Sequence, residues 1–134
     1  MTPDTYYDSL TSRQRANILA RRVLRWTPVK RDGDRIAYYH HGIYMRSDSD
    51  WQPDTYLDHA AIVVNGLTAA EYTHWANALI HLITKTTGDE HRDIAALMAI
   101  NWSADWRMKA IFTTLNILPL IHDKELYDTA EHHQ

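Results

Sequence analysis

The sequence predicts an α+β fold in which a small antiparallel sheet packs with four to five helices. The sheet is predicted from two tyrosine- and isoleucine-rich runs, RIAYYH and IYMR, which flank His41-Gly42 and are typical of a β-hairpin over about 34–46. The helices are predicted from apolar residues that recur every three or four positions behind recognisable N-caps. The length of 134 residues suits one compact domain covering 1–134, with a polar tail from about residue 122.

The first helix is predicted to begin after Thr11, because Gln14 lies three residues later and completes a capping box. Pro28 is expected to end this helix, since proline cannot continue the hydrogen-bond ladder. The apolar face is expected to consist of five residues at helical spacing: Ala16, Leu19, Ala20, Val23 and Trp26.

The hairpin follows a turn at Asp32-Gly33-Asp34, and its strands are expected at about 34–40 and 43–46. The stretch SDSD, residues 47–50, is expected to form a loop. Alternate side chains of a strand face opposite sides of the sheet. One face of the hairpin is therefore expected to carry Tyr38, His40 and Arg46.

A second helix is expected over about 55–65. Asp54 or Thr55 is expected to cap its start, and Gly66 is expected to end it. Its apolar stripe is expected to contain Leu57, Ala60, Ala61 and Val64.

The third helix is expected to begin at a second capping box, made by Thr68 and Glu71, and to end at Gly88. Leu67 and Tyr72 occupy the two positions of a hydrophobic staple. The apolar face continues through Trp75, Leu79, Leu82 and Ile83.

The run DIAALMAINW, residues 93–102, fits either a helix or a buried strand, so a third strand at about 94–102 stays open. Ser103 is expected to cap a last helix, which Pro119 ends. The buried face of that helix is expected to contain Met108, Ile111, Phe112, Leu115 and Leu118.

The composition excludes several kinds of site. The chain has no cysteine, so disulfides, thiolate metal sites and a cysteine nucleophile are excluded. The first ten residues lack the basic start and apolar run of a secretory signal, and no run of about 18 apolar residues is present. We therefore expect a cytoplasmic protein without a membrane partner.

Catalytic motifs are not found in the sequence. No serine lies in a G-x-S-x-G elbow, and the scattered glycines form neither a phosphate-binding loop nor a dinucleotide fingerprint. Glu71 and His74 form a single E-x-x-H motif, whereas a di-iron bundle needs two copies and two further glutamates. We therefore expect no enzymatic activity, no catalytic residues, no metal site and no cofactor.

The net charge of −3 is unevenly distributed along the chain. Residues 1–46 hold nine Arg or Lys and four Asp, whereas residues 47–134 hold five Arg or Lys and thirteen Asp or Glu. One interpretation is an electropositive face that binds a partner, with Arg15, Arg22 and Arg25 as candidate residues. The other interpretation is a solvated, arginine-rich helix.

Aromatic and cationic residues gather in the hairpin and just after it, which makes them candidates for binding a protein or a nucleotide. Aromatic rings beside a cation suit stacking on a base or holding a phosphate, although strand aromatics also pack a sheet against a helix. The pI near 6.3 disfavours general nucleic-acid binding. These candidates are Tyr38, Tyr39, His40, Tyr44, Arg46 and Trp51, of which Trp51 is favoured as structural.

Three short motifs connect part of the chain with a known family. They are V-L-R-W at Val23–Trp26, the tyrosine-rich strand, and W-Q-P-D-T at Trp51–Thr55 leading into D-H-A-A-I-V-V. With these motifs the segment Val23–Val64 resembles the phage ABA sandwich domain family, small bacteriophage proteins of mostly unknown function. KAIFTTL at Lys109–Leu115 is similar to the closing helix of that family.

The family continues with strands after its second helix, whereas Thr68–Thr87 is predicted to be helical here. This departure implies a smaller sheet with more helical cover. The resemblance implies a phage or prophage origin and an accessory role, and it transfers no catalytic residues.

These observations together favour a protein that works by binding in the host bacterial cytoplasm. The leading hypothesis is inhibition of a host bacterial defence factor, and the alternative is a sponge that sequesters a nucleotide signal. A weak hydrolase and a transcriptional regulator are less favoured. A homodimer is expected as well, because four aromatic residues exceed what a small core needs. They are Trp75, Trp102, Trp106 and Tyr127.

Overall fold

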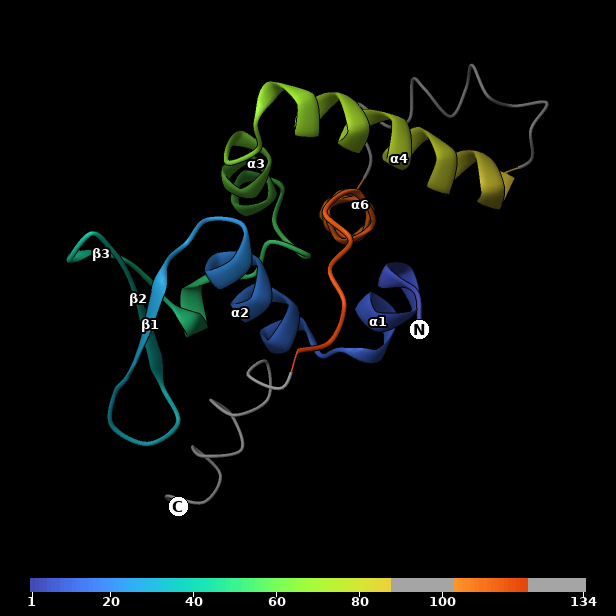
Figure 1. The fold of residues 1–134 in the computed structure, drawn as a ribbon. Coiled ribbons are helices and arrows are strands. Elements are labelled where there is room, and N and C mark those ends of the chain that lie inside the picture. Colours follow the sequence, from blue (N-terminus) through green and yellow to red (C-terminus); the bar gives the residue numbers. More distant parts are fainter. Residues whose placement is uncertain (88–102, 121–134) are drawn as a thin grey trace. The chain divides into compact units, whose positions relative to one another are not determined.

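The computed structural model describes residues 1–87 and 103–120, and it confirms an α+β fold (Figure 1). Its described part holds a three-stranded antiparallel sheet and five α-helices. The chain divides into two compact units. The helical unit comprises Met1–Ser9 and Pro53–Leu118, and the sheet unit comprises Leu10–Gln52 with Pro119–Gln134. The expectation of one domain over 1–134 stays a prediction.

The sheet unit begins with one helix, which is followed by the three strands of the sheet. The strands run in the order β1-β2-β3, and each neighbouring pair is antiparallel. A short 3-10 helix, η1, replaces the loop that was expected for SDSD. The bounds are α2 at Ser12–Arg22, β1 at Thr27–Lys30, β2 at Ile36–His40, β3 at Ile43–Ser47 and η1 at Asp48–Asp50.

The predicted hairpin is confirmed as β2 and β3. Its turn residues, His41 and Gly42, have φ angles of 52° and 78°. Two successive positive φ angles fit the two-residue turn that matches the twist of antiparallel strands. The register shifts between Tyr38 and Tyr39, so that Tyr38 faces Arg46 whereas Tyr39 faces Tyr44.

The first predicted helix is confirmed at its start and wrong at its end. The Thr11–Gln14 capping box is present, but α2 ends at Arg22 instead of continuing through Trp26. Arg25 has a φ angle of 61°, which takes the chain out of the helix before Pro28. Pro28 lies in β1, an edge strand, where the missing N–H of proline is tolerated.

The third strand of the sheet is therefore β1, which was not predicted, and the predicted helix end at Pro28 falls within it. The strand considered at about 94–102 lies outside the described residues, as do the helix end at Gly88 and the tail from 122.

Three aromatic rings pack together in the core of the sheet unit, beside buried aliphatic residues such as Ile18, Leu19 and Ile36. The ring of Trp26 lies 4.8 Å from that of Trp51 and 6.1 Å from that of Tyr38. The indole N–H of Trp51 donates to the carbonyl of Ala16 at 2.9 Å, which joins the chain after β3 to α2. The amide of the buried Asn17 donates to the Tyr38 hydroxyl at 2.9 Å, so the polar group on the central strand is satisfied.

The helical unit is organised around α6, which contacts the three other helices described in this unit. In Figure 1 α6 is viewed end-on between α4 and α1. Met108, Ile111 and Phe112 of α6 are fully buried. The bounds are α1 at Pro3–Ser9, α3 at Leu57–Asn65, α4 at Ala69–Thr87 and α6 at Ala104–Thr114.

Helix α1 was not predicted from the sequence, because seven residues carry no clear periodicity. Long-range contacts hold it instead. The ring of Tyr7 meets that of Phe112 edge-on at 5.0 Å, and its hydroxyl donates to the Asp105 carboxylate at 2.6 Å. Lys109 forms an ion pair with Asp8 at 2.9 Å.

The second predicted helix begins two residues later than expected. Helix α3 starts at Leu57 with Tyr56 as its N-cap, and Tyr56 makes no side-chain cap hydrogen bond. The predicted caps Asp54 and Thr55 are therefore wrong, although Gly66 ends the helix as predicted. The apolar stripe is rotated, because Leu57 and Ala61 are exposed and the buried residues are His59, Ala60, Val63 and Val64.

The other two helix starts are confirmed. The Thr68 backbone N–H donates to the Glu71 carboxylate at 2.8 Å, and the Glu71 N–H donates to the Thr68 hydroxyl at 3.2 Å. The Ser103 hydroxyl accepts from the Trp106 N–H at 3.5 Å. At the far end of α6 the prediction is partly wrong, because Leu115 and Leu118 are only half-buried.

The aromatic surface that suggested a homodimer is smaller than expected. Trp75 is buried in the helical unit, where its indole N–H donates to the Arg107 carbonyl at 2.9 Å. Trp106 is half-buried, and Trp102 and Tyr127 lie outside the described residues. The homodimer stays a prediction, but Trp75 does not support it.

Candidate functional site

Two of the predicted binding residues belong to the core of the sheet unit. Tyr38 is 0% exposed and Trp51 is 1% exposed, so neither offers a surface to a ligand. Trp51 therefore has the structural role that its motif suggested. Arg46 faces Tyr38 across the strands and covers this core, since its guanidinium lies 5.9 Å from the Trp51 ring. It also forms an ion pair with Asp50 at 3.3 Å.

Tyr39 and Tyr44 lie on the opposite face of the sheet from Tyr38, because neighbouring strand residues alternate in direction. Their rings meet nearly edge-on, 5.8 Å apart at 76°. Tyr44 is 55% exposed. The guanidinium of Arg31 lies 5.4 Å from the Tyr39 ring and donates to its hydroxyl. Sequence reasoning missed Arg31, although it begins the R-D-G-D-R turn before β2.

Strand β3 exposes apolar side chains at three consecutive positions. Ile43 is 67% exposed, Tyr44 is 55% exposed and Met45 is 39% exposed. This strand is an edge of the three-stranded sheet. An edge strand presents backbone groups as well as side chains, so β3 can contact a partner through both.

The remaining predicted residues lie in α2, in the connection from α2 to β1, and at the end of β2. Arg15 and Arg22 are half-buried residues of α2, and Arg25 is exposed in the connection to β1. His40 lies at the end of β2, and its ring packs 4.1 Å from that of His41. The two groups of candidates, the arginines near the first helix and the residues of the hairpin, therefore lie in separate parts of the sheet unit.

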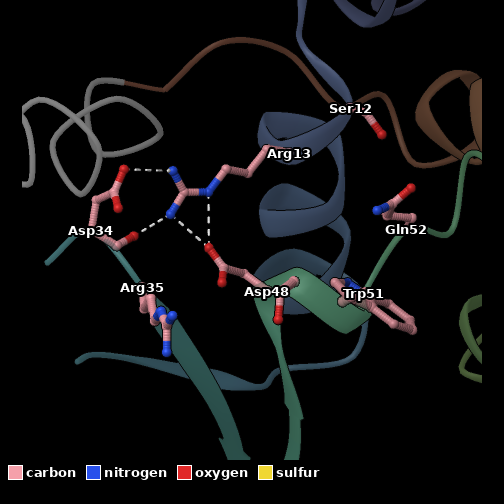
Figure 2. Close-up of a pocket in the computed structure, with 8 residues that line it drawn as sticks. Ser12, Arg13, Asp34, Arg35, Asp48, Trp51 and Gln52 are labelled. Carbon is pink, nitrogen blue, oxygen red and sulfur yellow. Dashed lines mark hydrogen bonds and ion pairs between the residues drawn. The ribbon is translucent and has the colours of Figure 1, made fainter. Parts of the chain in front are cut away.

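A first cavity, of about 410 Å³, lies against α2 and contains an ion-pair network (Figure 2). Arg13 contacts the Asp48 carboxylate at 2.6 and 2.8 Å and the Asp34 carboxylate at 3.5 Å. It also donates to the Asp34 carbonyl. These contacts tie α2 to the β1–β2 connection and to η1, which makes Arg13 a structural residue that sequence reasoning missed.

A second cavity, of about 400 Å³, opens beside β2 and β3. Its lining combines two arginines with two tyrosines and two serines: Arg31, Arg35, Tyr39, Tyr44, Ser47 and Ser49. Arg35 lines both cavities. In Figure 2 Arg35 makes none of the ion pairs drawn around Arg13.

Within residues 1–87 and 103–120, no group of three or more His, Asp or Glu side chains is placed to hold a metal ion. The two residues of the E-x-x-H motif do not act together. Glu71 completes a capping box, and His74 is exposed on α4. None of the described helices is long and apolar enough to cross a membrane.

No family model, no curated protein and no solved structure matches this chain. The chemistry of the hairpin follows from its own side chains. Exposed apolar residues can be buried against a partner, while tyrosine hydroxyls and guanidinium groups can bind carboxylates, phosphates and carbonyl oxygens.

Proposed function

We propose that the chain is a non-catalytic phage accessory protein that inhibits a host bacterial defence factor by binding it in the host cytoplasm. The phage origin and the accessory role rest on the resemblance of Val23–Val64. The binding role rests on one observation, the three consecutive exposed apolar residues Ile43, Tyr44 and Met45 on an edge strand.

Burial of this surface would stabilise a complex. Full burial of an exposed aliphatic or aromatic side chain contributes on the order of 2 kcal/mol to association. Tyrosine and arginine are enriched among the residues that dominate protein interfaces. Tyr44 on β3 therefore supplies an anchor beside the apolar side chains of Ile43 and Met45.

The charge of the sheet unit indicates an acidic partner. Leu10–Gln52 contains nine arginines or lysines and four aspartates, which gives +5, and Pro119–Gln134 contains one lysine and four Asp or Glu, so the whole unit carries a net charge of +2. A surface of one sign accelerates the encounter with a partner of the opposite sign, and salt weakens that effect. Inhibition by such a surface requires only that it covers a functional site on the host protein.

Affinity capture from bacterial lysate tests this proposal with three versions of the full chain. The wild type is compared with a double variant, Ile43→Asp with Met45→Asp, which places two carboxylates on the proposed surface. Tyr72→Asp is the matched control, because Tyr72 is 51% exposed on α4 in the helical unit. Circular dichroism establishes that all three chains are folded.

The wild type and Tyr72→Asp are expected to capture the same host protein at a stoichiometric ratio, while the double variant loses it. A partner captured equally by all three chains contradicts the proposed surface. Failure of the wild type to capture any stoichiometric protein contradicts the function itself.

A further inference from the structure

We propose that the second cavity of the sheet unit is a nucleotide-binding site, in which Arg31 and Arg35 hold the phosphate and the tyrosines contact the base. This site shares Tyr44 with the proposed protein-binding surface and is otherwise distinct from it, because Arg31 and Arg35 line the cavity whereas Ile43 and Met45 do not. The ligand class is an organic phosphate that carries an aromatic ring.

The connection between β1 and β2 brings the two arginines to the same cavity. The backbone N–H of Arg31 donates to the carbonyl of Arg35 at 2.8 Å, which closes the turn. Gly33 has a φ angle of 70°, a conformation that favours glycine at the tip of the turn. Both side chains line the cavity that opens beside the strands.

The charge in this cavity is positive. Within the described part of the chain, neither Arg31 nor Arg35 forms an ion pair with a carboxylate. Asp48 also lines the cavity, but Arg13 contacts its carboxylate at 2.6 Å and the Asp48 side chain is only 10% exposed. The planar guanidinium group suits the oxygens of a phosphate, which it binds through two parallel N–H donors.

The tyrosines give the cavity a preference for an aromatic ligand. Tyr44 is 55% exposed, so its ring is accessible to a base. Stacking on an exposed aromatic ring stabilises any nucleobase, since every base has a π face. The Ser47 and Ser49 hydroxyls lie 2.9 Å apart at the same cavity and provide hydrogen-bonding groups for a sugar.

The size of the cavity agrees with this ligand class. Its volume of about 400 Å³ falls within the range of small-molecule sites, roughly 300–1,000 Å³. Inorganic phosphate alone would contact the arginines and leave the tyrosines unused. A nucleotide uses both parts of the lining.

Isothermal titration calorimetry of the full chain tests the site with AMP, 3′,5′-cyclic AMP, adenosine and inorganic phosphate as probes. One of the two nucleotides is expected to bind at least about tenfold more tightly than either adenosine or phosphate, because only a nucleotide engages both parts of the lining. No binding of either nucleotide at millimolar concentration overturns the proposal, and so does phosphate binding as tightly as a nucleotide.

Two variants locate the site. Arg35→Ala is expected to weaken nucleotide binding about tenfold or more, the loss expected for one charge-assisted contact. Arg25→Ala is the matched control, since Arg25 is exposed in the same unit and does not line the cavity. Equal affinity for both variants overturns the assignment.

The same variants separate this proposal from the proposed inhibition. Arg35→Ala is expected to retain the captured host protein, whereas the double variant Ile43→Asp with Met45→Asp is expected to retain the nucleotide. Loss of both activities in either variant contradicts the separation of the two sites, whereas failure of the wild type to bind a nucleotide or to capture a host protein identifies which proposal fails.

Discussion

The helical unit and the sheet unit use their aromatic residues differently. In the helical unit Tyr7, Trp75 and Phe112 are buried, and the exposed Tyr56 and Tyr72 lie at or near helix starts. In the sheet unit Trp26 and Trp51 form the core, while the hairpin directs aromatic and aliphatic side chains outward. The difference supports the proposal that the hairpin, where three exposed apolar residues are consecutive, carries the binding surface.

The two units also carry net charges of opposite sign. Leu10–Gln52 with Pro119–Gln134 holds ten Arg or Lys and eight Asp or Glu, which gives +2, whereas Met1–Ser9 with Pro53–Leu118 holds four Arg or Lys and nine Asp or Glu, which gives −5. An acidic partner would therefore be attracted to the sheet unit and repelled by the helical unit.

The largest effects are expected from truncating the central aromatic residue of each core. Trp51→Ala and Phe112→Ala are each expected to lower the free energy of unfolding by about 3–5 kcal/mol, because a large buried side chain leaves a cavity. Urea denaturation followed by circular dichroism measures both. If Trp51→Ala lowered the free energy of unfolding by less than about 1 kcal/mol, Trp51 would not be a main residue of the core, which would contradict the comparison.

Smaller effects are expected from the buried polar contacts of the two units. Asn17→Ala removes the donor to the Tyr38 hydroxyl and the acceptor of the Arg21 N–H at 2.6 Å. The substitution is expected to lower the free energy of unfolding by about 1–3 kcal/mol, because buried polar groups lose their hydrogen-bond partners. Tyr7→Phe removes one hydroxyl that contacts Asp105 and is expected to cost about 1 kcal/mol. Urea denaturation measures both variants. A larger loss of unfolding free energy for Tyr7→Phe than for Asn17→Ala would contradict the expected order.

The two capping boxes provide an internal control, because the same motif begins a helix in each unit. Thr11→Ala and Thr68→Ala each remove the hydroxyl that accepts a backbone N–H. Each is expected to lower stability by about 1 kcal/mol. Thermal unfolding of the two variants measures the costs, and a cost confined to one unit would show that the other helix is held by packing alone.

The smallest effect concerns the pH dependence of α1. The Thr2 hydroxyl donates to the Asp4 carboxylate and lowers the pKa of that group. The stabilisation is therefore present above the ordinary pKa of an aspartate, about 4, and is lost as pH falls through the lower pKa of the folded state. Asp4→Asn is expected to remove this dependence of stability on acidic pH and to leave the rest of the pH profile unchanged. Denaturation at neutral and acidic pH measures the difference, and an identical pH profile for the variant contradicts it.

The sequence predicted those parts of the fold that depend on neighbouring residues. Capping boxes at Thr11 and Thr68 and the turn at His41-Gly42 are local signals, and all three are confirmed. The end of α2 was missed because Val23 and Trp26 continue the helical spacing, while the left-handed Arg25 leaves no sequence signal of its own. Helix α1 was missed because its contacts with α6 span about a hundred positions in sequence.

The candidate site was predicted only in part, because the choice of sheet face depends on what packs behind it. Tyr38 and Tyr39 are indistinguishable as residue types, yet α2 covers the first and leaves the second at the cavity. Arg31 and Arg35 are four positions apart in a turn, and only the closed turn places both beside the tyrosines. Such juxtapositions arise from tertiary structure and have no local pattern.

Amide hydrogen exchange of the full chain, alone and bound to the captured host protein, tests the central claim most directly. The hairpin is expected to carry the interface, so exchange at Ile43–Ser47 is predicted to slow on binding while exchange at Ala69–Thr87 stays unchanged. Slower exchange in α3 or α4 with an unchanged hairpin would contradict the account, because it would assign the interface to the helical unit.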